Sequence, residues 1–224
     1  MTHEPGDERM RVHRALALAG VASRRAAEGL VADGRVTVNG ARATVGQLVG
    51  PDDAIAVDGE PVRGREPRRA YLLNKAAGVV STASDPQGRP TVLDDLPGSI
   101  RLYPVGRLDI DTTGALLVTN DGELAARLMH PASKAPKTYE VLFRGQVSAR
   151  TLRALRDGVE LEDGMTAPAR AEMMERRTPG GTWVRLELTE GRNRQVRRMG
   201  EAVGHRVMRL HRSRYAGIGL QKLA

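Results

Sequence analysis

The sequence has no cysteine, few aromatic residues and no long hydrophobic run. Without cysteine, the chain can form neither a disulfide nor a thiolate metal site, and it has no cysteine nucleophile. Aromatic residues make up 3%, too few for a sheet surface that stacks several bases, as some RNA-binding folds do. The apolar stretches fall short of the ~20 residues that a membrane-spanning helix needs. The polar segment MTHEPGDERM is unlike a secretory signal, so we expect a cytoplasmic protein.

Basic residues are abundant by contrast. The 224 residues include 35 basic and 27 acidic side chains, which gives a formal net charge of +8. Of the basic residues, 31 are arginine and 4 are lysine. The guanidinium fork suits phosphates and base edges, so nucleic acid is the expected partner. A preference for arginine codons would also enrich surface arginines, but it does not explain why they cluster.

The chain length and a hydrophobic content of 40% predict a packed core in one or two domains. The stretch MRVHRALALAGVASRRAAEGLVADGRVTVNG predicts two helices and a strand, with Ser23 capping the second helix. Asn39-Gly40 is typical of a tight hairpin. The segment RGREPRR contains charge, glycine and proline but no apolar residue, which is typical of a linker. The expected organisation is therefore a small N-terminal domain, a linker and a second domain, at residues 10–62, 63–69 and 70–224.

The second domain mixes strand and helix patterns and is predicted to be α+β. GALLVTN has the continuous apolar run of a buried strand, and KTYEVLFRG alternates as a strand does. NDGELAARLMHP predicts a helix with Asn120 as its cap. SARTLRALRDG and RNRQVRRMGEAVGH predict two more helices, and APARAEMMERR and TWVRLELTEG two further strands.

Carboxylates gather in GRLDIDTTGALLVTNDG, at residues 106–122. A calcium loop that began at Asp109 would need a glutamate at its twelfth position, where Asn120 stands, so calcium is excluded. An Asp-x-Asp site for a metal-bound sugar nucleotide, formed by Asp109 and Asp111, stays open as a weak signal. Alternatively, Asp111 is a turn or cap residue, and Asp121 lies at a helix N-terminus, where the helix dipole stabilises it.

A third interpretation makes one carboxylate a nucleophile that attacks an electrophilic carbon, as in glycosidases. Such a carboxylate must be ionised and held in place, and a neighbouring arginine would lower its pKa and orient it. EGRNRQVRRM offers several arginines. A flat substrate would also need an aromatic side chain to stack on, and Tyr139, beside Lys137 in KTYEV, is the best candidate.

Two resemblances follow from these motifs. Residues 10–62 resemble the small RNA-binding domain first seen in ribosomal protein S-four. In that domain Ser23, Arg24 and Arg25 open a helix, where backbone N–H groups and two arginines favour a phosphate. Residues 70–220 resemble the RsuA/RluB-type ribosomal RNA pseudouridine synthases through VGRLDIDTTGALLVTNDGELAARLMHP, KTYEV and EGRNRQVRRMGEAVGHRVMRLHR, in that order.

The second resemblance implies an α+β fold with a mixed, mainly antiparallel sheet flanked by helices. It also implies an isomerase that converts uridine to pseudouridine without metal or organic cofactor. Asp109 would attack either the anomeric carbon of the sugar or carbon 6 of the base. Tyr139 would pack on the uracil and help to deprotonate carbon 5, and Arg197 would pair with Asp109.

The resemblance also implies residues that contact substrate or RNA. Leu210 would pack near the base, Arg107 would enter the RNA beside the flipped nucleotide, and the remaining basic candidates are Lys137, Arg192, Arg194 and Arg198. The expected partner of the monomeric protein is ribosomal RNA or a ribosomal subunit precursor, and the large subunit is preferred to the small one. The rivals are a small-subunit enzyme, a non-catalytic ribosome-assembly factor and the metal-dependent transferase.

Overall fold

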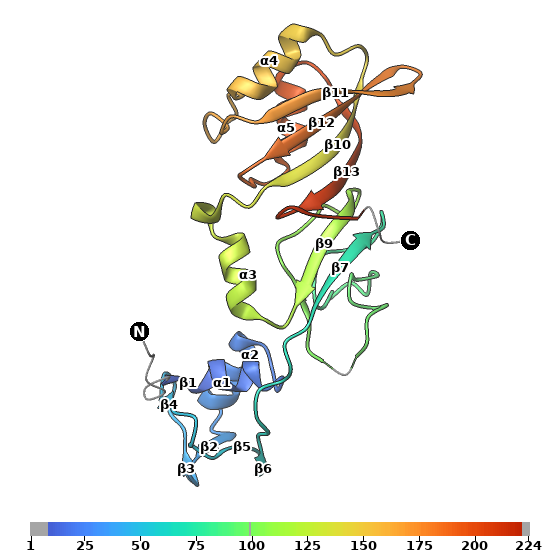
Figure 1. Cartoon of the computed structure of the whole chain (residues 1–224). Coiled ribbons are helices and arrows are strands. Elements are labelled where there is room, and N and C mark those ends of the chain that lie inside the picture. The colour runs from blue at the N-terminus through green and yellow to red at the C-terminus, as the bar shows by residue number, and fades with distance from the viewer. Residues whose placement is uncertain (1–8, 99, 221–224) are drawn as a thin grey trace. The chain divides into compact units, whose positions relative to one another are not determined.

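The computed structural model describes residues 9–98 and 100–220 (Figure 1). These residues form two compact units. The first comprises residues 9–68, 98 and 100–101, and the second comprises residues 69–97 and 102–220. The division after residue 68 falls inside the segment RGREPRR. No helix in either described part is long and apolar enough to cross a membrane.

The first unit combines two short helices with small sheets. The helices are α1 (Val12–Leu18) and α2 (Arg24–Ala32). A four-stranded antiparallel sheet has the order β3-β2-β5-β6 and a two-stranded one pairs β1 with β4. Their bounds are β1 Met10–Arg11, β2 Val36–Val38, β3 Ala41–Arg42, β4 Leu48–Val49, β5 Ile55–Val57 and β6 Glu60–Pro61.

Local signals in the sequence account for this unit. The Ser23 hydroxyl accepts a hydrogen bond from the Ala26 N–H at 3.1 Å, as predicted for an N-cap. Asn39 and Gly40 both have positive φ, at 53° and 80°, so they form the tight turn between β2 and β3. Apolar side chains from both helices and the strands share one buried cluster, which includes Val12, Leu16 and Val36. The predicted helices and strands of this segment are confirmed.

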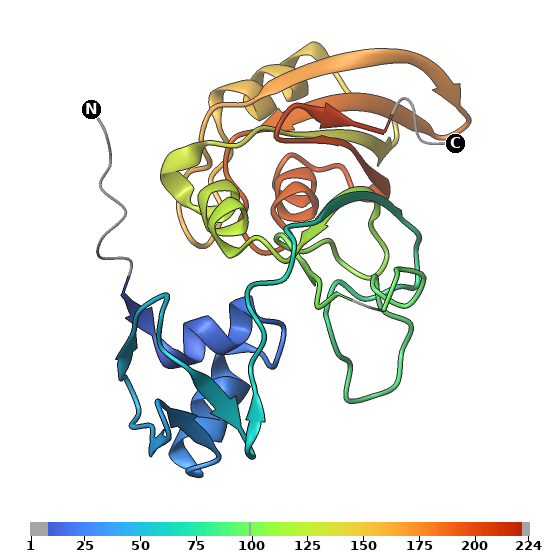
Figure 2. The same ribbon diagram turned by 60° about the horizontal axis from the view of Figure 1, so that its bottom comes forward.

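The second unit is built on an eight-stranded sheet. Six strands follow the order β11-β12-β10-β13-β9-β7, while β14 pairs with β13 and β8 with β9. Every pairing is antiparallel except β13 with β9. The bounds are β7 Ala70–Lys75, β8 Tyr103–Pro104, β9 Thr113–Thr119, β10 Lys137–Arg144, β11 Arg170–Thr178, β12 Gly181–Leu188, β13 Val207–Tyr215 and β14 Ile218–Gly219. Figure 2 shows β11 and β12 as a long curved hairpin.

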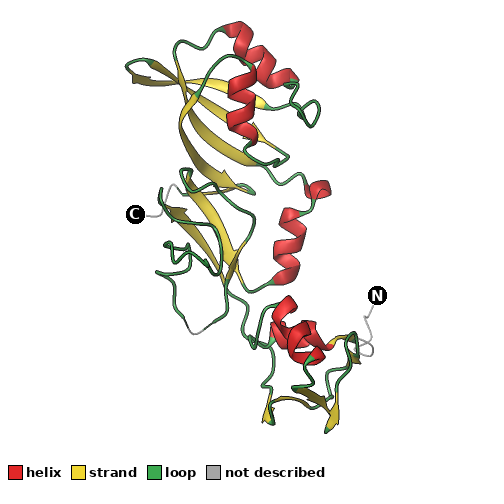
Figure 3. Cartoon of the chain, turned by 180° about the vertical axis from the view of Figure 1, so that it is seen from behind, coloured by secondary structure: helices red, strands yellow, loops and turns green. Residues whose placement is uncertain are grey.

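Helices pack on both faces of this sheet. They are α3 (Gly122–Met129), α4 (Ala149–Asp157) and α5 (Gln195–Ala202), with a short 3-10 turn at Pro131–Ser133. Leu155 of α4 and Met199 of α5 belong to the main core cluster, and both helices lie on the same side of the sheet (Figure 3). In β9, Leu116 points into this cluster, whereas Leu117 joins a second cluster with Ala125 of α3. Because side chains alternate along a strand, α3 covers the opposite face of β9. The α+β prediction is confirmed.

Gly114 lies where the parallel strands β9 and β13 meet, opposite Arg212. Its φ is +108°, and a Cβ atom there would lie 2.2 Å from the Arg212 carbonyl oxygen. Only glycine permits this backbone conformation and this close approach. The loop that carries Asp109 ends at this contact, so Gly114 fixes where that loop enters the sheet.

Two details differ from the sequence-based expectations. The cap of α3 is Asp121, whose Oδ1 accepts hydrogen bonds from the N–H groups of Glu123 and Leu124 at 3.0 Å each, so the prediction of Asn120 is wrong. Asn120 instead accepts a bond from the Arg69 N–H at 2.7 Å. The sequence analysis did not predict β13, because three arginines and a histidine interrupt its apolar alternation. Its pairing with β10 also shifts register twice.

Candidate active site

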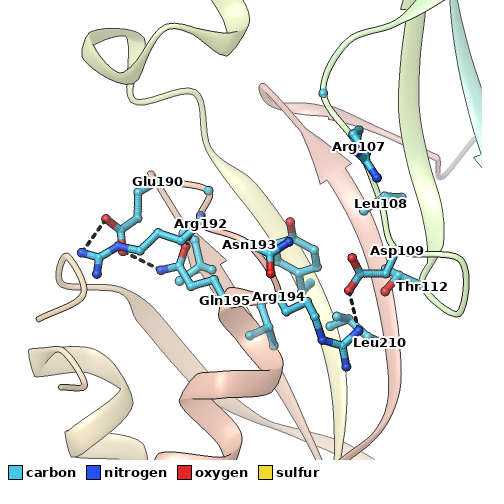
Figure 4. A pocket seen from close by; sticks show the side chains of 15 residues that line it. Arg107, Leu108, Asp109, Thr112, Glu190, Arg192, Asn193, Arg194, Gln195 and Leu210 are labelled. Atoms are coloured by element: carbon cyan, nitrogen blue, oxygen red, sulfur yellow. Dashed lines mark hydrogen bonds and ion pairs between the residues drawn. The ribbon is translucent and has the colours of Figure 1, made fainter. Parts of the chain in front are cut away.

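A pocket of about 340 Å³ opens in the second unit, between the loop before β9 and the segment before α5 (Figure 4). The first wall carries Arg107, Leu108, Asp109 and Thr112. The second wall carries residues 190–196, and Tyr139, Leu188 and Leu210 form the apolar floor. The pocket therefore combines two carboxylates, Asp109 and Glu190, with several arginines and an aromatic ring. Four segments contribute to it, at residues 106–112, 139, 188–196 and 210.

Asp109 faces two arginines across this pocket. Its Oδ2 atom lies 3.5 Å from Nη1 of Arg194 and 3.8 Å from Nε of Arg197. Within residues 9–98 and 100–220, no hydrogen bond or ion pair involves the second oxygen, Oδ1. The carboxylate side chain is 32% exposed. One oxygen is thus oriented by positive charge while the other is available to a ligand.

Arg197 is the more deeply buried of the two arginines. Its side chain is 11% exposed, and Nη2 lies 2.9 Å from Oδ2 of Asp111 and 3.5 Å from the Thr112 hydroxyl. Its Nε atom is buried and, among the described residues, has no hydrogen-bond partner. A buried donor without a partner is rare in proteins and commonly marks a functional site. The Nε atom of Arg197 lies 3.8 Å from Oδ2 of Asp109, so it is the donor that could form a hydrogen bond to Asp109.

Hydrogen bonds from a neighbouring segment hold the Asp109 loop. The Lys75 ammonium donates to the carbonyl oxygens of Thr112 at 2.8 Å and Ile110 at 3.3 Å, and also to that of Ala76. Burial lowers the pKa of Lys75, although the nearby Asp111 and Asp109 carboxylates oppose the shift. Ser81 bonds to both the N–H and the carbonyl of Leu108. The loop is therefore fixed by main-chain contacts on both sides of Asp109.

Tyr139 reaches the pocket from the centre of the sheet. It lies in β10, next to a register shift in the pairing with β13, and its residue is 9% exposed. A β-bulge of this kind changes the direction in which a side chain points. Leu210 of β13 is also buried and lines the same floor. A flat ring could therefore pack between the tyrosine and the aspartate.

The remaining predicted site residues are not all in the pocket. Arg107 lies at its rim and is exposed. Arg192 lines the pocket, and both Arg192 and Arg198 form ion pairs with Asp163, so their guanidinium groups already have an intramolecular partner. Lys137 does not line the pocket and donates to the Ala135 carbonyl at 2.9 Å. In the first unit, Arg24 and Arg25 are exposed at the start of α2, beside the capping Ser23.

The sequence-based reasoning missed several residues that build the site. Asp111 is predicted to be a turn or cap residue or part of an Asp-x-Asp metal site, yet it forms the shortest ion pair of Arg197. The sequence analysis predicts no site role for Lys75 or Ser81. The sequence offers one signal for the role of Lys75, which ends the mostly apolar strand β7. A buried ammonium needs hydrogen-bond acceptors nearby, so such a lysine indicates a polar contact. In the part of the chain that the structure describes, no group of three or more His, Cys, Asp or Glu residues could hold a metal ion.

Comparison with known proteins identifies the class to which this fold and pocket belong. Residues 69–202 match the family model described as RNA pseudouridylate synthase, and residues 10–55 match the S4 domain. The chain therefore belongs to the RNA pseudouridylate synthase family, a class of RNA isomerases, and carries an S4 domain before its catalytic part. Both resemblances inferred from the sequence are confirmed.

Individual relatives extend over most of the chain. It is 46% identical to "Ribosomal large subunit pseudouridine synthase B" of Bacillus subtilis (strain 168), over 95% of this chain and 88% of that protein. It is 45% identical to the protein of the same name from Pseudomonas aeruginosa, covering 97% of this chain but only 58% of that protein. A solved structure described as "Crystal structure of pseudouridylate synthase" superposes with a TM-score of 0.65 at 29% identity, covering 94% of this chain and 90% of that one.

Proposed function

We propose that this protein converts a specific uridine of large-subunit ribosomal RNA to pseudouridine, with Asp109 as the nucleophile. The observation that carries the proposal is the position of Asp109, with one oxygen near two arginines and the other directed to a pocket floored by Tyr139 and Leu210. The names of the most similar relatives favour the large subunit as the source of the RNA.

The geometry suits nucleophilic attack by an ionised carboxylate. The two arginines orient Asp109 through Oδ2, which leaves the lone pairs of Oδ1 for the substrate. Both arginine contacts are long, and such contacts commonly shorten when substrate binds. Arg197 Nε, which is buried and lacks a partner among the described residues, would gain its hydrogen bond in that step. The electrophile is either the anomeric carbon or carbon 6 of the uracil.

The reaction balances without any other reactant. The bond between the sugar and N1 of uracil breaks, the base rotates against the pocket floor, and carbon 5 bonds to the sugar. Carbon 5 loses its proton to solvent, N1 gains one, and the Asp109 carboxylate is regenerated. Tyr139 would hold the ring and assist removal of the proton. The target base must leave its stack, which costs a few kcal/mol, and Arg107 at the pocket rim could offset part of that cost by contacting the flanking RNA.

The basic side chains of the first unit supply a second RNA contact in this proposal. Arg24 and Arg25 flank the N-terminus of α2, where free N–H groups favour a phosphate. Ribosomal RNA or a partly assembled subunit is the proposed partner, a monomer the proposed state and the cytoplasm the proposed location.

The test measures tritium release from ribosomal RNA labelled at carbon 5 of uridine, in the presence of EDTA. Wild type is compared with Asp109→Asn and with Asp95→Asn, an exposed carboxylate of the same unit. Substrates are naked large-subunit and small-subunit RNA and partly assembled subunits. We expect release by wild type and D95N and none by D109N, on large-subunit material.

The other outcomes separate the rivals. Release from small-subunit RNA alone would move the target to that subunit. Equal RNA binding by wild type and D109N, with no release by either, would favour the assembly factor. Loss of activity in EDTA that is restored by a divalent cation would favour the metal-dependent transferase that uses Asp109 and Asp111.

A further inference from the structure

Asp163 lies outside the pocket, on the loop between α4 and β11, and it joins two arginines that flank the pocket wall. Its Oδ1 and Oδ2 accept hydrogen bonds from Nη1 and Nη2 of Arg198 at 2.9 and 3.1 Å. Nη1 of Arg192 donates to Oδ1 at 3.3 Å. The bonds from Arg198, and then those from Arg192, hold the pKa of Asp163 below its usual range. This two-pronged contact is the most directional form of an ion pair.

Arg198 transmits this contact to the pocket wall. Its Nε donates to the carbonyl oxygen of Asn193 at 2.9 Å, so one guanidinium bridges the Asp163 carboxylate and the main chain. The next residue along the chain is Arg194, the N-cap residue of α5. Asp163 therefore fixes the peptide group that immediately precedes the arginine facing Asp109.

Arg194 depends on such support. Its φ is +48° and its ψ is 30°, a left-handed conformation that residues other than glycine adopt only when their surroundings impose it. From that position Nη1 reaches Oδ2 of Asp109 at 3.5 Å. The side chain is about half exposed, so packing alone does not hold it. The main-chain conformation decides where this cation lies.

A second set of bonds ties the same wall to the Asp163 loop. Arg192 donates to the Gly164 carbonyl at 2.8 Å, and Oε1 of Glu190 accepts from the Ala167 N–H at 3.1 Å. Glu190 also accepts from Gln195, whose Oε1 in turn accepts from the Arg192 N–H at 3.0 Å (Figure 4). Glu190 and Arg192 of this wall are thus bound to residues 163–167, and Gln195 is bound to both of them.

We infer that Asp163 is a positioning residue for the isomerisation: it holds Arg198 and Arg192 so that Arg194 is presented to Asp109 and the target nucleotide. The inference rests on the proposed function. It also assigns Arg192 and Arg198 to the ion-pair network of Asp163, so that they orient the pocket wall and do not contact RNA.

Direct binding of RNA by Arg192 and Arg198 predicts a different effect of removing the Asp163 charge. If Arg192 and Arg198 bound RNA phosphates directly, Asp163 would compete with the RNA for them. Removal of its charge would then release two cations, tighten RNA binding and leave the rate of the bound complex unchanged.

The experiment compares wild type, Asp163→Asn, Asp163→Glu and Glu160→Gln, an exposed carboxylate in the same loop. Single-turnover rates of tritium release and the RNA dissociation constant are measured separately. We expect D163N to lower the rate about 10- to 100-fold, because a small misplacement of a pocket group is costly, with RNA affinity unchanged to within about twofold. D163E should recover part of the rate, and E160Q should match wild type.

A double-variant cycle completes the test. If Asp163 acts through Arg194, D163N should slow the Arg194→Ala protein far less than it slows wild type. Fully additive losses, a wild-type rate in D163N, or tighter RNA binding at an unchanged rate would each overturn the inference. If D163N does not fold, as judged by circular dichroism, D163E and Arg198→Lys provide the same comparison. A wild-type protein that releases no tritium would overturn the proposed function itself.

Discussion

Arg197 makes its shortest ion pair with Asp111 and not with Asp109. Nη2 of Arg197 lies 2.9 Å from Oδ2 of Asp111, whereas its Nε lies 3.8 Å from Oδ2 of Asp109. One arginine therefore bridges two carboxylates that are two positions apart. The contact with Asp111 fixes the orientation of the Arg197 guanidinium plane. The distance between Arg197 and Asp109 can still shorten.

Asp111→Asn should reduce activity much more than stability. Loss of the charge at Asp111 frees Arg197 to turn away from Asp109, so we expect a fall in kcat of about 10- to 100-fold. Because the Asp111 side chain is 53% exposed, the free energy of unfolding should change by less than about 1 kcal/mol. Single-turnover kinetics and urea unfolding measure the two effects. A drop in stability without loss of kcat would show that Asp111 serves the fold alone.

Lys75→Met should destabilise the second unit and also slow the reaction. The methionine keeps the apolar part of the side chain but leaves the carbonyls of Ile110 and Thr112 without their donor, at a cost of about 1–3 kcal/mol. The Asp109 loop then loses one of its anchors. Urea unfolding and tritium release would be compared with Lys134→Met, an exposed lysine that we expect to behave as wild type. Equal behaviour of the two variants would contradict the anchoring role.

Gly114→Ala should be among the most destabilising single-methyl additions to this protein. The positive φ and the 2.2 Å approach to the Arg212 carbonyl force the two parallel strands apart, and we expect a loss of about 3 kcal/mol. Gly145→Ala is the matched control, because Gly145 has a φ of +79° but open space around its Cβ position. Gly145→Ala should lower the free energy of unfolding only by the cost of the left-handed backbone conformation, about 1 kcal/mol. Chemical unfolding of both variants tests the difference.

Asp85→Asn should lower stability at neutral pH but not in strong acid. Arg89 donates hydrogen bonds to Asp85 from its side chain and its N–H, and they lower the pKa of this carboxyl to about 2. A carboxyl with a lower pKa in the folded state stabilises the fold above its unfolded pKa of about 3.9. That contribution disappears as the pH falls from about 4 to 2.

The melting temperatures of wild type and D85N should therefore differ at pH 6–8 and converge at low pH. Asp95→Asn, which replaces an exposed neighbouring carboxylate, serves as the control for general acid effects. A difference between wild type and D85N that stays constant from pH 7 to pH 2 would contradict the assigned pKa.

The sequence alone determined the local structure and the family. Short-range signals such as the Ser23 cap, the Asn39-Gly40 turn and the apolar run of β9 act between residues close in the chain, so their pattern predicts the elements they form. The ordered motifs around Asp109, Tyr139 and Arg197 predicted an RNA pseudouridine synthase, and the family match confirms this class. The roles of these three residues stay predictions for the experiments above.

Only the tertiary structure decided which charged groups meet. Asp111 and Arg197 are far apart in the sequence, as are Asp163 and Arg198, and both contacts exist because the fold brings α5 close to the loops that carry Asp111 and Asp163. The sequence predicts that Arg192, Arg194 and Arg198 bind RNA alike, yet Arg192 and Arg198 are paired with Asp163 and Arg194 is paired with Asp109. An arginine has the same charge in any position, and its partners depend on which carboxylates the fold places within reach.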